Sequence, residues 1–131
     1  MPTNEVGAPY RYLRQVANGI EDAIGQAAQQ VPPPTAEWLP RKIDRVTMQR
    51  AAAATPGGID RQLAMELFDA VAKDGVATDR DLYNKVERAA SSLVMADANS
   101  NGVTTTSEVK NAGISDCFAK DLFESAHRLG G

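Results

Sequence analysis

The residues best suited to chemistry lie in one short segment that runs from Asp97 to Glu108. Oxygen-bearing side chains stand at spaced positions along it, and they are Asp97, Asn99, Asn101, Thr105 and Glu108. Gly102 lies among them, where a sharp turn with positive φ requires glycine. A hard cation such as calcium binds six to eight oxygen atoms from carboxylates, amides and backbone carbonyls. The residue types and their spacing therefore predict a calcium site.

This segment resembles the loop of the EF-hand calcium-binding family, and the resemblance covers its flanks from Ala89 to Asn111. It implies a twelve-residue loop in which positions 1, 3, 5, 7, 9 and 12 supply the ligands. The metal ligands implied for this chain are Asp97, Asn99, Asn101, the carbonyl of Val103, Thr105 and Glu108. Thr104 departs from the family pattern, because an aliphatic residue usually stands there and pairs with a neighbouring loop. We expect this departure to weaken the pairing and to leave the ligands intact.

The same residues also allow a purely structural interpretation. Thr105 and Glu108 have the spacing of a capping box, in which two side chains close the first turn of a helix. The residues before Gly102 could form an ordinary turn-rich loop. Each feature is common by itself, but the two in register with a central glycine favour the metal site.

A partial copy of the pattern lies earlier in the chain, at residues 70–81. Asp74 and Gly75 match Asn101 and Gly102, but alanines occupy the first two ligand positions. We therefore expect a degenerate hand that binds no calcium. It either pairs with the intact loop, or an unbroken helix over 79–96 holds the two segments at its opposite ends, where they cannot pair.

Apolar spacing predicts the helices that position these residues. The expected helices cover 9–31, 41–54, 59–73, 79–96, a short stretch from 106, and 115–129. The expected fold class is all-α, a small helical domain with an EF-hand-like helix-loop-helix and no strand of useful length. The expected parts are an N-terminal amphipathic helix at 1–31, a Pro-rich connector at 32–42 and an EF-hand-like domain at 43–131.

The first expected helix carries an apolar stripe with two interpretations. The stripe consists of Tyr10, Leu13, Ala17, Ile20, Ile24, Ala27 and Val31. Such faces mostly bury in a core. The alternative is that helix 9–31, or the last helix, docks on a partner protein.

Composition and charge exclude several functions. The net charge is −3 without a Lys/Arg cluster, so we expect no nucleic-acid partner. No apolar run reaches the length of a membrane span. His127 is the only histidine, which excludes sites and triads that need several. A Sec signal peptide is missing, so we expect a cytoplasmic location or secretion by a route that needs no such signal.

These features predict a non-enzymatic helical protein that binds one Ca²⁺ per chain, in a structural or sensor role. The alternative is a protein–protein interaction module or a secreted bacterial effector in which calcium is structural or incidental. The alanine-rich composition and the lone intact loop favour a bacterial source. A third interpretation is an enzyme whose site only the fold assembles.

Overall fold

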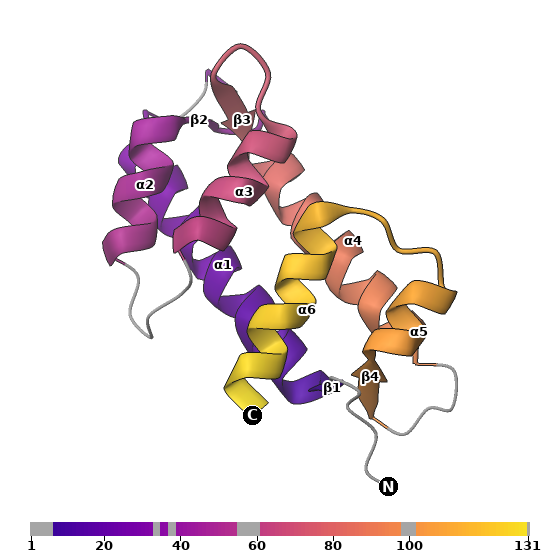
Figure 1. Ribbon diagram of the computed structural model, residues 1–131. Helices are drawn as coiled ribbons and strands as arrows, with labels where there is room; N and C mark the ends of the chain where they lie inside the picture. The colour runs from indigo at the N-terminus through magenta and orange to yellow at the C-terminus, as the bar shows by residue number, and fades with distance from the viewer. Residues whose placement is uncertain (1–6, 33–34, 37–38, 55–60, 98–101, 131) are drawn as a thin grey trace, which may run out of the picture. The chain divides into compact units, whose positions relative to one another are not determined.

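The computed structural model describes residues 7–32, 35–36, 39–54, 61–97 and 102–130. Six helices lie in this part of the chain: α1 (Tyr10–Gln30), α2 (Arg45–Ala54), α3 (Arg61–Val71), α4 (Asp79–Met95), α5 (Thr106–Asn111) and α6 (Cys117–Gly130). Four strands of three residues each accompany them: β1 (Gly7–Pro9), β2 (Lys42–Asp44), β3 (Val76–Thr78) and β4 (Val103–Thr105). Figure 1 shows the helices and strands. The predicted mostly α-helical fold is confirmed, and the sheets are limited to two small antiparallel pairs.

Among the described residues, each strand ends where a helix begins. β1 leads into α1, β2 into α2, β3 into α4 and β4 into α5 without an intervening residue. No strand of useful length is expected from the sequence, and the observed strands, of three residues each, are too short to show alternating hydrophobicity. They matter because each one fixes the starting point of the helix that follows.

The apolar stripe of α1 belongs to the core. Five of its side chains have at most 1% of their surface exposed, and they are Leu13, Ala17, Ile20, Ile24 and Ala27. Tyr10 and Val31, at its two ends, are half-buried. The core interpretation is therefore confirmed, and this face of α1 is not a free docking surface. None of the described helices is both long enough and apolar enough to span a membrane.

Contacts divide the chain into two compact units. One unit contains residues 1–17 and 88–131, and the other contains residues 18–87. This division differs from the expected parts at 1–31, 32–42 and 43–131. The reason is that β1 pairs with β4 and so joins the beginning of the chain to its last third.

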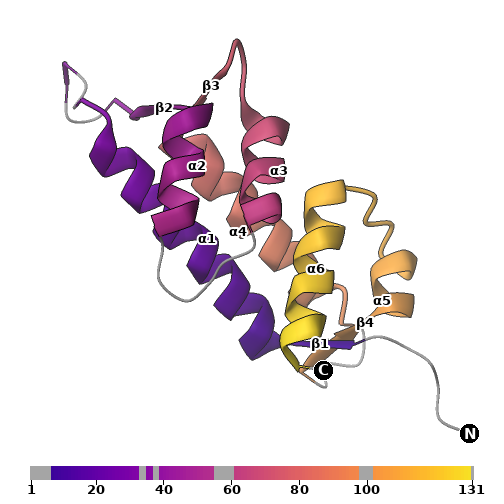
Figure 2. The same ribbon diagram turned by 60° about the vertical axis from the view of Figure 1, so that its left-hand side comes forward.

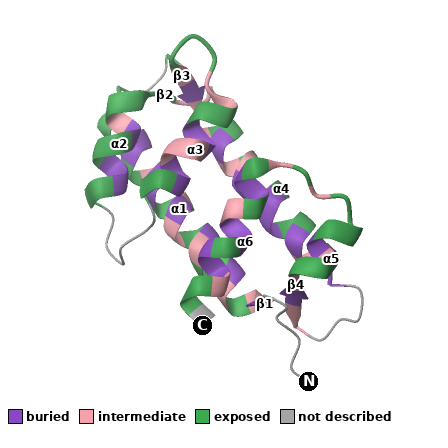
Figure 3. Cartoon of the chain, viewed as in Figure 1, coloured by how far each residue is buried: buried purple, intermediate pink, exposed green. Residues whose placement is uncertain are grey.

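The first unit is organised around the β1–β4 pair. In this pair Gly7 faces Thr105, Ala8 faces Thr104 and Pro9 faces Val103. Helix α6 packs against β1, and α5 follows β4 directly (Figures 1 and 2). Figure 3 shows α6 with a buried face and an exposed face, as expected for an amphipathic helix. The buried face of α6 consists of Phe118, Ala119, Leu122, Phe123 and Ala126.

The second unit contains the other strand pair and the α2–α3 hairpin. Ile43 in β2 faces Ala77 in β3, and both side chains are buried. Helices α2 and α3 lie side by side (Figure 2), and an ion pair between Arg45 and Asp69 links them. This unit contains the residues that were expected to form a degenerate hand.

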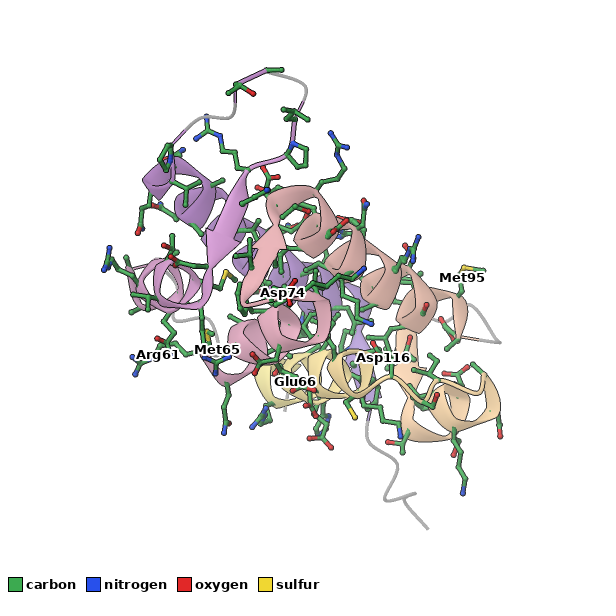
Figure 4. The ribbon with its side chains drawn as sticks, turned by 90° about the horizontal axis from the view of Figure 1, so that it is seen from above. Arg61, Met65, Glu66, Asp74, Met95 and Asp116 are labelled. Carbon is green, nitrogen blue, oxygen red and sulfur yellow. The ribbon has the colours of Figure 1, made fainter. Side chains whose placement is uncertain are left out.

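Residues 70–81 do not form a twelve-residue loop. Ala70 lies within α3, and Lys73 and Val76 exchange two backbone hydrogen bonds of 2.8 and 3.1 Å across a tight turn. Asp74 and Gly75 occupy that turn with φ values of 55° and 79° (Figure 4 labels Asp74). This is the backbone of the two-residue hairpin turns that favour Asp-Gly.

Helix α4 is unbroken, and its two flanking strands have different partners. β3, before the helix, pairs with β2, whereas β4, after it, pairs with β1. Of the two expected arrangements, the structure therefore has the one in which residues 70–81 and the intact loop do not pair with each other.

Candidate metal centre

The candidate calcium loop joins the end of α4 to the start of α5. Met95 is the last residue of α4, and its side chain projects outward with 83% of its surface exposed (Figure 4). Four of the predicted ligands lie in described positions, and they are Asp97, Val103, Thr105 and Glu108. The predicted ligands Asn99 and Asn101 lie outside the described residues.

Asp97 is the central acidic group of the loop. Only 5% of its surface is exposed, and its Oδ1 atom is fully buried. Its Oδ2 atom accepts two hydrogen bonds, one of 3.0 Å from the Gly102 N–H and one of 2.7 Å from the Tyr10 hydroxyl. A buried carboxylate is costly unless hydrogen-bond donors or a cation compensate its charge. The fixed Oδ2 and buried Oδ1 fit a ligand that holds a cation through one oxygen.

Gly102 gives the loop its turn. Its φ value is 83°, in the left-handed region that residues with a Cβ adopt only with strain. This conformation directs its N–H toward the Asp97 carboxylate five residues earlier. The spacing predicted a sharp turn with positive φ at Gly102, and the backbone has this turn.

Thr105 and Glu108 form the predicted capping box at the start of α5. Thr105 is the N-cap residue, and its Oγ1 accepts a 3.2 Å hydrogen bond from the Glu108 N–H. The Glu108 Oε1 accepts one of 3.0 Å from the Thr105 N–H and one of 3.2 Å from its hydroxyl. In this conformation the Glu108 carboxylate therefore closes the helix, and it would have to turn to bind a cation.

Thr104, at the centre of β4, is a polar residue whose buried hydroxyl has a hydrogen-bond partner. Its side chain is fully buried, and its Oγ1 donates a 2.7 Å hydrogen bond to the Leu93 carbonyl near the end of α4. The hydroxyl thus satisfies a carbonyl at a helix end, where intrahelical donors run out. Its backbone pairs with Ala8 of β1. The loop strand therefore has a pairing partner, although the partner is a terminal strand and not a second loop.

Tyr10 is the residue of this site that sequence reasoning missed. Its N–H donates a 3.0 Å hydrogen bond to the Gly102 carbonyl, and its hydroxyl reaches Asp97 and, at 3.3 Å, the Val94 carbonyl. In the sequence, Tyr10 is recognisable only as a member of an apolar stripe. The two side chains are 87 residues apart in the chain, and no local pattern signals a contact of that range.

The environment raises the pKa of the Tyr10 hydroxyl above its usual value. The hydrogen bond to the Asp97 carboxylate is the main cause, followed by burial and by the negative charges of Asp97 and Glu108. Both carboxylates therefore act on the same phenol.

The strand that carries Tyr10 into this site is held from two sides. A Cβ atom on Gly7 would lie 2.9 Å from Val103 Cγ1, so a larger residue at this position would force Val103 or the strand to shift. On the other side, His127 Nδ1 lies 2.8 Å from the Gly7 carbonyl oxygen. In the tautomer that protonates Nδ1, His127 donates this hydrogen bond to the carbonyl.

Charged side chains alone do not make a metal cage in the described part of the chain. In that part, no group of three or more His, Cys, Asp or Glu side chains lies close enough together to hold a metal ion without other ligands. A cation in the loop would therefore depend on amide, hydroxyl and carbonyl oxygens in addition to Asp97 and Glu108. Calcium accepts such a mixed oxygen set.

A groove of about 620 Å³ lies between α5 and α6. The buried side chains of Val109 and Phe123 and the half-buried side chain of Ile114 line its apolar part. The exposed side chains of Lys110, Lys120 and Glu124 also line it. Its size falls in the range of pockets that hold small molecules or apolar anchors of a partner.

The fold and this site define a small, mostly helical chain whose candidate loop is held by a two-stranded sheet. No protein-family model, curated protein or solved structure matches the chain.

Proposed function

We propose that this chain is a non-enzymatic protein that binds one Ca²⁺ in the loop from Asp97 to Glu108. The observation that carries the proposal is the geometry of Asp97. Its Oδ2 is held by the Gly102 N–H and the Tyr10 hydroxyl, while its Oδ1 is buried. Such a carboxylate has one oxygen fixed by donors and a second one for a cation.

The proposed ligands are those that the spacing of the loop implies. They are Asp97, Asn99, Asn101, the Val103 carbonyl, Thr105 and Glu108. Glu108 would exchange its capping hydrogen bonds for contacts to the ion, since position 12 of such a loop binds calcium through both carboxylate oxygens. Calcium binding would thus be coupled to the first turn of α5. A structural role suits this coupling, because an ion that binds only the folded loop stabilises the fold.

A calcium titration followed by NMR tests the proposal. The Gly102 amide should be among the most strongly shifted signals, because its N–H donates to a carboxylate that binds the ion. The titration should saturate at one Ca²⁺ per chain, and Asp97→Asn should prevent saturation. Two equal sites would contradict the view that residues 70–81 are degenerate, and no binding at millimolar calcium would refute the proposal.

The groove between α5 and α6 favours a second candidate function, that of an interaction module with incidental calcium. Two exposed lysines and the exposed Glu124 give the lining a net charge of +1 beside its apolar side chains, which favours a partner segment with an apolar anchor and an acidic group. The dye 1-anilinonaphthalene-8-sulfonate has this chemistry and should bind there. Ile114→Asp should reduce its fluorescence several-fold, whereas Val46→Asp, at an exposed residue of α2, should not. Equal fluorescence in all three proteins would count against the groove.

A further inference from the structure

The first residues of the described chain contact the candidate loop through backbone and side chain. β1 pairs with β4, and the Tyr10 N–H extends this ladder by donating to the Gly102 carbonyl at 3.0 Å. The side chain of Tyr10 then reaches the Asp97 carboxylate at 2.7 Å. One residue therefore contacts both the turn of the loop and its first acidic group.

The two donors on Asp97 fix the orientation of its carboxylate. The Gly102 N–H comes from within the loop and the Tyr10 hydroxyl from α1, and both donate to Oδ2. A carboxylate with two donors on one oxygen cannot rotate without breaking both hydrogen bonds. Oδ1 is thereby kept as the oxygen that a cation in the loop can bind.

We propose that Tyr10 is a positioning residue for calcium: its hydroxyl orients Asp97 from outside the loop and so sets the calcium affinity. The inference rests on the calcium site proposed above and goes beyond it, because Tyr10 belongs to no loop position. Donors that orient a metal ligand contribute strongly to affinity, and their loss typically weakens binding 10- to 100-fold.

The packing of Tyr10 does not require its hydroxyl. The ring begins the apolar stripe of α1, and phenylalanine would occupy the same position in that stripe without donating to Asp97. Tyr12 provides a matched control on the same helix. The Arg11 guanidinium lies over the Tyr12 ring, with 4.7 Å between the Arg11 Cζ atom and the ring centroid. The Tyr12 hydroxyl accepts a 3.1 Å hydrogen bond from Arg11. Both variants lose one phenol hydroxyl, but only the Tyr10 hydroxyl donates a hydrogen bond to Asp97.

The experiment measures Ca²⁺ affinity by calorimetry for the full chain and for the variants Tyr10→Phe and Tyr12→Phe. Tyr10→Phe should weaken binding roughly 10- to 100-fold, and Tyr12→Phe should leave it unchanged. Circular dichroism without calcium checks that both variants fold. Luminescence of bound Tb³⁺, excited through tyrosine, gives a second readout. Tyr12→Phe should keep most of this emission, and Tyr10→Phe should lose most of it.

The outcomes separate this inference from the calcium site itself. If the unmodified chain binds calcium and Tyr10→Phe binds it equally well, the inference is overturned while the site stands. Tighter binding by Tyr10→Phe would also overturn it, because the hydroxyl would then compete with the ion for Asp97. If Tyr10→Phe does not fold, the inference is tested by NMR on the unmodified chain, from the tyrosine ring signals measured with and without calcium. Calcium should shift those of Tyr10 and not those of Tyr12, and equal shifts would refute the inference. If the unmodified chain binds neither Ca²⁺ nor Tb³⁺, both proposals fail.

Discussion

Replacing Glu108 with glutamine separates the two roles that this side chain can have. Its Oε1 caps α5 by accepting the Thr105 N–H at 3.0 Å. Glutamine also serves at this position of a capping box, because its amide oxygen can accept the same hydrogen bond. It lacks the negative charge, however, and offers a cation one oxygen in place of two. Glu108→Gln should therefore keep the helix and lose most of the calcium affinity.

The size of the loss follows from the charges of the loop. Its formal negative charges are Asp97 and Glu108, since positions 3 and 5 are the neutral Asn99 and Asn101. Calcium affinity in such loops rises with ligand charge, so we expect a dissociation constant on the order of 10⁻⁵ to 10⁻³ M. Removing one of the two charges and one ligand oxygen should weaken binding roughly 100-fold, which corresponds to about 2.7 kcal/mol.

Thermal unfolding with and without calcium measures this loss. With a dissociation constant of ~10⁻⁴ M, 10 mM calcium should raise the free energy of unfolding by about 2.7 kcal/mol. In a chain of 131 residues, this corresponds to a rise in Tm of roughly 8 to 13 °C. For Glu108→Gln the same calcium concentration would about equal the dissociation constant, and the Tm should rise by only ~2 °C.

Asp116→Asn is the matched control for charge and capping. Asp116 precedes α6, and its Oδ2 accepts a 3.2 Å hydrogen bond from the Ala119 N–H (Figure 4 labels Asp116). This variant also removes one negative charge from a helix start, but outside the loop, and should keep the full calcium shift. If Glu108→Gln keeps the full shift too, Glu108 is a cap and not a ligand. If both variants lose the shift equally, net charge is the controlling factor and the ligand assignment is refuted.

Three further variants and one pH series test the candidate loop and the strand pair that holds it. Gly102→Ala should lower the free energy of unfolding by about 1–2 kcal/mol in urea denaturation, because a Cβ at this position meets no atom of the described residues within 4 Å, while the φ of 83° is strained for alanine. Gly7→Ala should lower the free energy of unfolding by about 1–3 kcal/mol, because its Cβ would lie 2.9 Å from Val103 Cγ1. Adding Val103→Ala to the same chain should restore part of this stability. If no stability is restored, the contact with Val103 is not the cause of the loss. Asn99→Asp should tighten calcium binding in calorimetry by adding a third negative charge, and looser binding would refute the ligand assignment. The folded-state pKa of Tyr10 is raised above the unfolded value of about 10 by its hydrogen bond to a carboxylate, so its stabilisation should be complete below pH ~10 and be lost as the pH rises through the folded pKa. Burial also raises the pKa of Tyr83, so urea denaturation against pH should show a larger loss in the unmodified chain than in Tyr10→Phe.

The helices could be predicted from the sequence because their signals are local. The stripe in α1 and the Asp74-Gly75 stop after α3 involve neighbouring residues, and the observed helix ends fall within four residues of the expected ones. The predicted parts of the chain differ from the two units that the contacts define. They relied on the prolines near residue 33, whereas the contacts depend on β1, which is three residues long and has no strand pattern.

The candidate site was predictable only along its own loop. Spacing placed Asp97, Gly102 and Glu108, because one turn and one helix start bring these residues together. Tyr10 could not be placed, since its contact with Asp97 depends on a pairing between two strands that are far apart in the sequence, β1 and β4. Hydrophobic periodicity assigned Tyr10 to the core, and that assignment carries no information about its hydroxyl.

The pairing of β1 with β4 has a consequence for the order of folding. Gly7 leaves the ribosome long before Thr105, its partner in the strand pair, has been synthesised. Helices can form early from local contacts, but this strand pair must close a loop that spans about three quarters of the 131 residues. The entropic cost of closure grows only with the logarithm of loop length, yet contacts between distant residues slow folding. The environment of Asp97 is therefore completed late, when β1 and β4 have paired.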